Sequence, residues 1–347
     1  MPPLEPSGSR PAAALPLDHP CVFALLQRSP GLCDADEDDW GQRSALRGSG
    51  ILILDVPVHR GEEPAVPRTY RYVIADVFTD VPFAGNQLAV FTDARGLTEV
   101  EMQTLAREVG FSETTFVLPA QGDADVRMRI FTPARELPFA GHPTLGTAFV
   151  VGAPLQRLTV RLQTAAGVVP VALQREGARI VFGRMEQPLP EIAPYERAEE
   201  LCALLGVGSC LPVERYDNGT PHVFVMLDSA EAVAALTPDF GALARLTGPV
   251  GVNCFAAHGA HVKTRMFGPE LGVFEDPATG SAAGPLAVHL ARHGLIAWGD
   301  EIQISQGAEI GRPSTLFATV EGGPHLPARV EVGGAAVIVA RGEYQLA

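Results

Sequence analysis

The alternation of apolar and polar residues becomes regular after Tyr70. Residues 72–78 alternate and are rich in β-branched and aromatic side chains, a pattern typical of a strand buried on one face. Turn-forming residues occupy 80–86, and residues 87–91 repeat the strand pattern. Further apolar runs predict two more strands, at 114–118 and 126–131. This part of the chain therefore predicts a sheet.

A helix is predicted between these strands. Thr98, followed three residues later by Glu101, has the spacing of a capping box. The apolar positions after it continue one helical face, and Gly110 supplies the stop. The helix therefore delivers the chain to Ser112 and Glu113 at the start of the next strand.

The chain contains an internal repeat. Residues 129–133 (RIFTP) recur as 265–269 (RMFGP), and each copy is followed by a glycine-centred turn that opens an apolar segment. The first turn is 140–144 (AGHPT), and the second is 279–283 (TGSAA). A weaker echo joins Thr115–Leu118 to Val223–Met226. The sequence therefore predicts an α+β chain of two similar halves, each with several strands and a long apolar helix.

Residues 1–68 differ from the rest of the chain. They are Pro-rich, carry an acidic run at 34–39 and contain one apolar stretch, at 51–58. We expect a poorly ordered or loosely docked extension. Two explanations are open. One is a regulatory tail, and the other is an appended leader or a start codon placed too far upstream.

Composition excludes several classes of protein. The formal net charge of −14 argues against a nucleic-acid partner, because such proteins present basic patches to phosphates. No apolar run approaches the roughly 20 residues that span a bilayer, which predicts a soluble, cytoplasmic protein with no membrane partner. The cysteines are scattered without metal-ligand spacing, so we predict free thiols and no metal.

The two glycine turns are candidate anion sites. A helix N-terminus concentrates unpaired N–H groups and partial positive charge, and small residues around Gly141 and Gly280 allow close approach of a ligand. A duplicated fold would place the turns face to face across a cleft. Alternatively, these small residues serve helix packing alone.

Polar residues near the turns are candidates for chemistry. His142 and Ser281 lie within the turns, and Asp276 precedes the second one, although each is also a common turn or cap residue. Glu113 enters an apolar strand, where partial desolvation would raise its pKa and suit it to take and return a proton. The alternative is a buried or capping glutamate satisfied by backbone N–H groups.

Five segments carry a resemblance to a known family. They are DVFTDVPFAGNQLAVF (76–91), FSETTFV (111–117), FTPARELPFAGHPTLG (131–146), EDPATGSAAG (275–284) and QGAEIGRPS (306–314). Together they resemble the PhzF-like family of phenazine biosynthesis, from about Tyr70 to the C-terminus. The resemblance implies a diaminopimelate-epimerase-like fold of two pseudo-symmetric domains, each a curved sheet or barrel around a central helix, assembled as a homodimer.

The resemblance also implies an activity and a domain division. The family's isomerase shifts a proton on trans-2,3-dihydro-3-hydroxyanthranilate, a small cyclic carboxylate, without a cofactor. We expect a first domain of residues 69–186 plus 335–347 and a second of 187–334. The final strand, around Ala335–Leu346, is expected to return to the first domain.

Residue roles follow from the same resemblance. The general acid/base falls on Glu113, and the other catalytic positions fall on His142 and Asp276. The substrate-binding positions are Asn86, Gly141, His142, Asp276, Gly280 and Ser281. Arg312 lies in a shared loop. For both Asn86 and Arg312, a purely structural role is the alternative.

Departures from related sequences bear on the chemistry. Related epimerases carry one thiol in each glycine turn, where this chain has Ala140 and Thr279. Neither side chain exchanges a proton at neutral pH, which excludes a two-thiol racemase. Many relatives also have Cys, Asn and Met where this chain has Ala140, Gly110 and Ile310, which leaves the ligand's identity open. A thiol-free epimerase or hydrolase and a non-catalytic binding protein remain alternatives.

Overall fold

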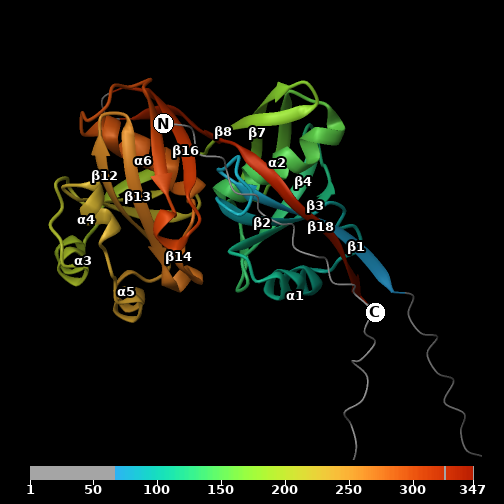
Figure 1. The fold of residues 1–347 in the computed structure, drawn as a ribbon, viewed down its shortest axis with the longest axis horizontal. Coiled ribbons are helices and arrows are strands. Elements are labelled where there is room, and N and C mark those ends of the chain that lie inside the picture. Colours follow the sequence, from blue (N-terminus) through green and yellow to red (C-terminus); the bar gives the residue numbers. More distant parts are fainter. Residues whose placement is uncertain (1–66, 324–325, 347) are drawn as a thin grey trace, which may run out of the picture. The chain divides into compact units, whose positions relative to one another are not determined.

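The computed structural model describes residues 67–323 and 326–346 (Figure 1), all within one compact unit, Glu62–Ala347. The predicted extension lies outside the described residues except for positions 67 and 68. Its boundary is slightly wrong, since Arg68 already belongs to the first strand. None of the described helices is both long and apolar enough to cross a membrane.

The first half contains the elements drawn from blue to green in Figure 1. They are β1 (Arg68–Val77), β2 (Asn86–Phe91), α1 (Glu99–Val109), β3 (Glu113–Pro119), β4 (Val126–Phe131), β5 (Glu136–Leu137), α2 (Gly141–Leu155), β6 (Thr159–Thr164), β7 (Gly167–Glu176) and β8 (Arg179–Glu186).

The second half and the final strand follow. Their helical elements are α3 (Ala198–Leu205), α4 (Ala230–Ala234), α5 (Phe240–Thr247), α6 (Gly280–Arg292) and the short 3-10 helices η1 (Pro269–Leu271) and η2 (Ala308–Ile310). Their strands are β9 (Glu191–Pro194), β10 (Glu214–Asp217), β11 (Pro221–Met226), β12 (Gly251–His258), β13 (His261–Gly268), β14 (Val273–Asp276), β15 (Glu301–Gln306), β16 (Ser314–Gly322), β17 (Pro327–Gly334) and β18 (Ala336–Leu346).

The pairing of strands confirms the duplication. In the first half, β1–β2 and β3–β4 are antiparallel while β2–β3 and β4–β6 are parallel. In the second half, β10–β11 and β12–β13 are antiparallel while β11–β12 and β13–β15 are parallel. The equivalent of β3 is therefore β12. The predicted echo between Thr115–Leu118 and Val223–Met226 is wrong, because the latter lies in β11, the equivalent of β2.

Strands also pass between the halves. β18 pairs along the whole of β1, as predicted for the final strand, and the red strand follows the blue one in Figure 1. β17 pairs with β8, which makes the two sheets continuous. The domain limits proposed from the sequence stay a prediction.

The two glycine turns open the two central helices. In α2, every residue from Gly141 to Gly152 is buried, and in α6 every residue from Gly280 to Ala291 is buried. A helix that is apolar on all sides is stable only inside a core. The strands of each half supply that core, because α2 packs on β1 and β8 while α6 packs on β16 and β17.

The predicted capping box is present at α1. The Thr98 side chain accepts a hydrogen bond from the Glu101 backbone N–H, and the Glu101 carboxylate accepts one from the Thr98 backbone N–H. Gly110 ends the helix at φ 71°, in the left-handed region that glycine adopts without a Cβ penalty. These signals fix where the chain turns into β3 and hence where Glu113 lies.

Candidate active site

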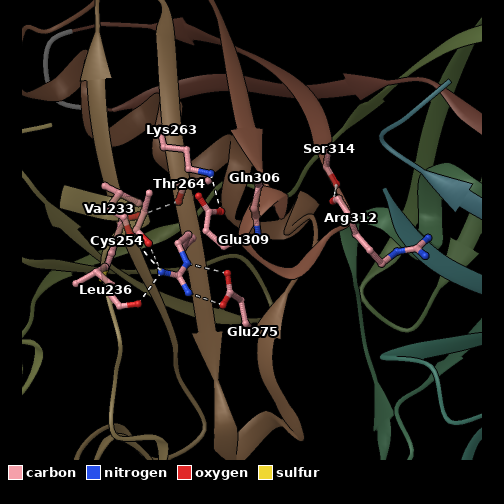
Figure 2. A network of polar contacts seen from close by, with 12 residues as sticks. Val233, Leu236, Cys254, Lys263, Thr264, Glu275, Gln306, Glu309, Arg312 and Ser314 are labelled. Atoms are coloured by element: carbon pink, nitrogen blue, oxygen red, sulfur yellow. Dashed lines mark hydrogen bonds and ion pairs between the residues drawn. The ribbon is translucent and has the colours of Figure 1, made fainter. Parts of the chain in front are cut away.

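The repeated arginine anchors the segment before each central helix. The Arg129 Nε on β4 donates to Glu136 Oε1 on β5 at 2.6 Å, and the Arg265 Nε on β13 donates to Glu275 Oε1 on β14 at 2.8 Å. Figure 2 shows Glu275 and Leu236 on opposite sides of this guanidinium. The Leu236 carbonyl also accepts a hydrogen bond from Arg265. The Glu275 carboxylate, and with it the adjoining Asp276, is thereby held at the entrance to α6.

The N-termini of α2 and α6 meet in the centre of the molecule. A Cβ atom on Gly141 would lie 2.4 Å from the Gly280 carbonyl carbon, so only glycine permits this approach. The N-cap residues, Ala140 and Thr279, make no side-chain cap hydrogen bond. The free backbone N–H groups in the first turns belong to Gly141, His142, Gly280 and Ser281, which have no acceptor among the described residues. Two partly positive helix ends therefore converge on one point.

Glu113 and His142 face each other beside these helix ends. Glu113 Oε2 lies 3.4 Å from His142 Nε2, and both atoms are buried without a hydrogen-bond partner. Burial, reinforced by the charge of Asp276, raises the pKa of Glu113 well above its usual range. Burial lowers the pKa of His142 to about 3. Both shifts favour the neutral forms, so at neutral pH this contact is a close polar pair and not an ion pair.

Asn86 contacts both Asp276 and the His142 imidazole and so orients them. Its amide nitrogen lies 2.8 Å from Asp276 Oδ1, 3.0 Å from the Ala278 carbonyl and 3.2 Å from His142 Nδ1. An amide nitrogen has two hydrogens, and the two shorter contacts use them. Asn86 therefore has no hydrogen left for His142 Nδ1, and the unpartnered Nε2 faces Glu113.

Asp276 is buried within a dense hydrogen-bond network. Thr279 Oγ1 donates to its Oδ2 at 2.7 Å, and Gln306 Nε2 donates to its backbone carbonyl at 2.8 Å. Burial nevertheless raises the pKa of Asp276, against these hydrogen bonds and that of Asn86. Two carboxyls of raised pKa, Glu113 and Asp276, thus lie close to one another, an arrangement that lets a site hold or release one proton near neutral pH.

A cavity of about 220 Å³ opens onto these groups. Its lining includes most of the residues predicted from the sequence, namely Glu113, Gly141, His142, Asp276, Gly280 and Ser281. Residues of both halves contribute, as a cleft between duplicated halves requires. Thr132, Leu137, Met266 and Leu271 add a largely apolar wall. A small molecule with one anionic group suits a cavity of this lining.

Two predicted residues lie outside the lining. Asn86 acts through the hydrogen bonds described above. Arg312 lies away from the cavity, and Figure 2 shows its side chain extended toward the first half. There its Nε donates to the Gly85 carbonyl at 2.7 Å, and its Nη2 donates to buried Asp76 at 2.6 Å. Of the two explanations left open for Arg312, the structure favours the structural one.

Sequence reasoning missed two polar residues at the site. His222 lines the cavity, and Gln306 supports the N-terminus of α6 by accepting from the Thr279 backbone N–H. His222 lies in an apolar strand, where a single histidine gives no signal of function. Gln306 belongs to one of the family-like segments, which was the available signal.

One described cluster has side chains of the metal-binding type: Glu214, His289 and His293. Glu214 Oε2 already accepts hydrogen bonds from Arg292 at 2.9 Å and from Tyr216 at 2.9 Å, besides its contacts with both imidazoles. A guanidinium on the same oxygen opposes a second cation. His289 is also nine residues beyond the start of α6, about 13 Å along the helix. The cluster is therefore explained as a hydrogen-bond network remote from the cavity.

The described cysteines are also remote from the chemistry. Cys202, Cys210 and Cys254 are free thiols, as predicted, and none lines the cavity. Cys21 and Cys33 lie outside the described residues. The positions at the two N-caps are Ala140 and Thr279, so neither offers a thiol to a ligand.

Comparison with known proteins identifies the family. Residues 75–342 match the PhzC-PhzF family, described as phenazine biosynthesis-like protein. The chain is 50% identical over 278 residues to trans-2,3-dihydro-3-hydroxyanthranilate isomerase of Pseudomonas aeruginosa, which covers 80% of this chain and 100% of that protein.

Solved structures agree with this assignment. A PhzF-family phenazine biosynthesis protein of Bacillus anthracis superposes with a TM-score of 0.69 at 27% identity, covering 81% of this chain and 99% of that one. A hydroxyproline epimerase of Agrobacterium vitis superposes with a TM-score of 0.57 at 12% identity, covering 80% and 93%. The second likeness concerns the fold alone, and it confirms the predicted epimerase-like α+β architecture. By these similarities and its own geometry, the chain belongs to the phenazine biosynthesis-like PhzC-PhzF family and is an isomerase.

Proposed function

We propose that this isomerase moves a proton on a small cyclic carboxylate, trans-2,3-dihydro-3-hydroxyanthranilate or a close analogue, with Glu113 as the general acid/base. The observation that carries the proposal is the Glu113 carboxyl, whose Oε2 is buried and unpartnered beside two uncapped helix N-termini. The substrate's name comes from the relative with 50% identity.

The substrate carboxylate would bind at the meeting helix ends. The N–H groups of Gly141 and Gly280, with those of the residues that follow them, have no acceptor in the described chain and lie where the two helix dipoles converge. Binding there leaves the ring near Glu113, on the same cavity wall as His142 and Asp276.

The proton transfer then needs no group beyond the side chains present. Ionised Glu113 takes the proton from one ring carbon, and the electron pair left behind shifts through the ring double bonds. Glu113 returns the proton to a second carbon, so the side chain ends as it began. A raised pKa suits both steps, because neither protonation state is strongly disfavoured near neutral pH. Neutral His142 and Asp276 would orient the substrate and receive hydrogen bonds during the shift.

Two further predictions remain with this proposal. The sequence resemblance implies a homodimer, and the composition of the sequence predicts a cytoplasmic location; both are proposals here. A two-thiol racemase stays excluded because Ala140 and Thr279 occupy the required positions. A thiol-free epimerase or hydrolase and a non-catalytic binding protein are the alternatives to this proposal.

The test is turnover of trans-2,3-dihydro-3-hydroxyanthranilate, followed by ultraviolet absorbance, with Glu113→Gln. Removing a general acid/base is expected to lower kcat by about 10²–10⁴-fold. Glu108→Gln, an equal change at an exposed position of α1, is the matched control and should keep full activity. Turnover by Glu113→Gln at the rate of the unsubstituted protein would refute the role of Glu113. Absence of turnover in the unsubstituted protein would refute the substrate.

A further inference from the structure

A histidine that the proposed mechanism does not use contacts Ser281. His222, at the start of β11, places its Nε2 3.0 Å from Ser281 Oγ, in the first turn of α6. Both residues are buried and line the cavity. In the described chain, His222 is the only group that hydrogen-bonds the Ser281 hydroxyl. Which of the two donates decides what Ser281 offers a ligand.

The contacts of Asn253 determine which ring nitrogen of His222 carries the proton. Its amide nitrogen lies 3.3 Å from His222 Nδ1, 3.2 Å from the Gly251 carbonyl and 3.4 Å from the Val223 carbonyl. A flipped amide would set its oxygen against two carbonyl oxygens, so the nitrogen is correctly placed on this side. The amide nitrogen has two hydrogens, and its two shorter contacts, with the Gly251 carbonyl and with His222 Nδ1, use them. Nδ1 is therefore the unprotonated nitrogen of the ring.

The proton of His222 consequently sits on Nε2 and is donated to Ser281 Oγ. The hydroxyl oxygen accepts this bond, which leaves its own hydrogen free to point into the cavity. Burial lowers the pKa of His222 to about 4, so the ring stays neutral and keeps this tautomer at working pH. A Cβ on Gly251 would lie 2.6 Å from His222 Nδ1, so glycine at this position leaves room for the ring.

We propose that His222 and Asn253 are positioning residues that turn the Ser281 hydroxyl into a hydrogen-bond donor aimed at a carboxylate oxygen of the substrate. The proposal rests on the proposed function only for the choice of substrate. The hydroxyl would add a donor to the backbone N–H groups of α2 and α6, so the two meeting helix ends present several hydrogen-bond donors to a ligand. Such an end selects carboxylates and rejects amines at the same position.

Asn253→Asp is the sharpest perturbation. A carboxylate oxygen in place of the amide nitrogen can only accept, so it moves the His222 proton to Nδ1, at the cost of facing the Gly251 and Val223 carbonyl oxygens. Nε2 then accepts a hydrogen bond from the Ser281 hydroxyl, and a hydroxyl lone pair faces the ligand carboxylate. With anthranilate as the probe, measured by calorimetry, we expect Asn253→Asp to weaken binding about 10- to 100-fold, the size of one lost charge-assisted hydrogen bond. The loss should exceed that of Ser281→Ala.

A double-mutant cycle separates positioning from a merely structural role. If Asn253 acts through the hydroxyl, adding Asn253→Asp to Ser281→Ala should cost little further affinity. Equal losses with and without the hydroxyl would overturn the proposal. Should Asn253→Asp not fold, His222→Leu in the same cycle gives the same test, and His222→Gln, whose amide can donate to Ser281, should restore binding.

A direct readout is independent of binding and turnover. Nitrogen-15 NMR of histidine-labelled protein at pH 7, with the His222 signal assigned by its loss in His222→Gln, should show a proton on Nε2. A proton on Nδ1 would overturn the proposal even for an active enzyme. If the Nε2 tautomer and the binding cycle hold while trans-2,3-dihydro-3-hydroxyanthranilate is not turned over, the proposed substrate fails and this inference stands.

Discussion

Replacing Glu113 with glutamine should stabilise the fold at neutral pH. The carboxyl is buried, with a side chain only 15% exposed, and its environment raises its pKa. Glutamine has almost the same shape and carries no titratable proton. Its amide can also hydrogen-bond His142 Nε2, which lies 3.4 Å from the present Oε2, because an amide offers both a donor and an acceptor. The substitution therefore removes the cost of ionising a buried acid without leaving a cavity.

The sign and size of the effect follow from proton linkage. Between the unfolded pKa of a glutamate, about 4.3, and the raised folded pKa, the folded state binds a proton that the unfolded state does not. Stability due to Glu113 is thus fully present below pH 4 and is lost as the pH rises through the folded pKa. The slope is about 1.4 kcal/mol per pH unit. From pH 5 to pH 7 the glutamine variant should gain on the order of 2 kcal/mol relative to the unsubstituted protein, after a discount for partial exposure.

Urea unfolding at pH 5, 6, 7 and 8 measures this difference. The gap between the two proteins should be small at pH 5 and widen toward pH 7. In thermal unfolding at pH 7, the midpoint temperature of the variant should be roughly 4–8 °C higher. Groups other than Glu113 and its neighbour Asp276 titrate alike in both proteins and cancel. The opposite result would be a rise, with pH, in the stability of the unsubstituted protein relative to the variant. Glu113 would then be an ion-paired carboxylate of lowered pKa, and the reasoning would be refuted.

Two further predictions concern the framework. Gly141→Ala should lower the free energy of unfolding by about 1–3 kcal/mol and impair carboxylate binding, because its Cβ meets the backbone of Gly280. Gly208→Ala, with no atom near its Cβ, is the control and should change neither. Urea unfolding and binding assays measure the two effects. Arg312→Ala should lower the free energy of unfolding by about 3–5 kcal/mol in urea unfolding at pH 7, because the buried carboxylate of Asp76 loses its cationic partner. A loss under 1 kcal/mol would contradict the assignment of this pair as a link between the halves.

Local signals in the sequence were enough to predict elements that are specified locally. The capping box at Thr98 and the left-handed glycine at 110 act within one turn of helix, so spacing alone reveals them. The repeated arginines were recognisable because each must meet a glutamate just before a central helix, at Glu136 and Glu275. The wrong echo has the opposite cause: short buried strands share the same apolar residues, so Thr115–Leu118 resembles many strands that are not its equivalent.

The site itself required three dimensions. Glu113 and His142 meet because β3 and α2 are brought together, and no sequence spacing states that their free atoms lie 3.4 Å apart. His222 and Asn253 lie on neighbouring parallel strands, β11 and β12, and His222 contacts Ser281 on a third element, α6. The family resemblance supplied the roles of Glu113 and His142. It could not supply the tautomer of His222, which depends on where two backbone carbonyls point.

The opposite signs expected for stability and activity separate the two explanations of Glu113. A capping or structural glutamate would be held by hydrogen bonds to its ionised form, and its replacement would lower stability while turnover survived. A desolvated acid/base gives the reverse: replacing it raises stability at neutral pH and abolishes turnover. The gain arises because the folded protein no longer bears the free-energy cost of desolvating a carboxyl. The measured signs in one variant therefore decide the question, and no assumption about the substrate enters the stability arm.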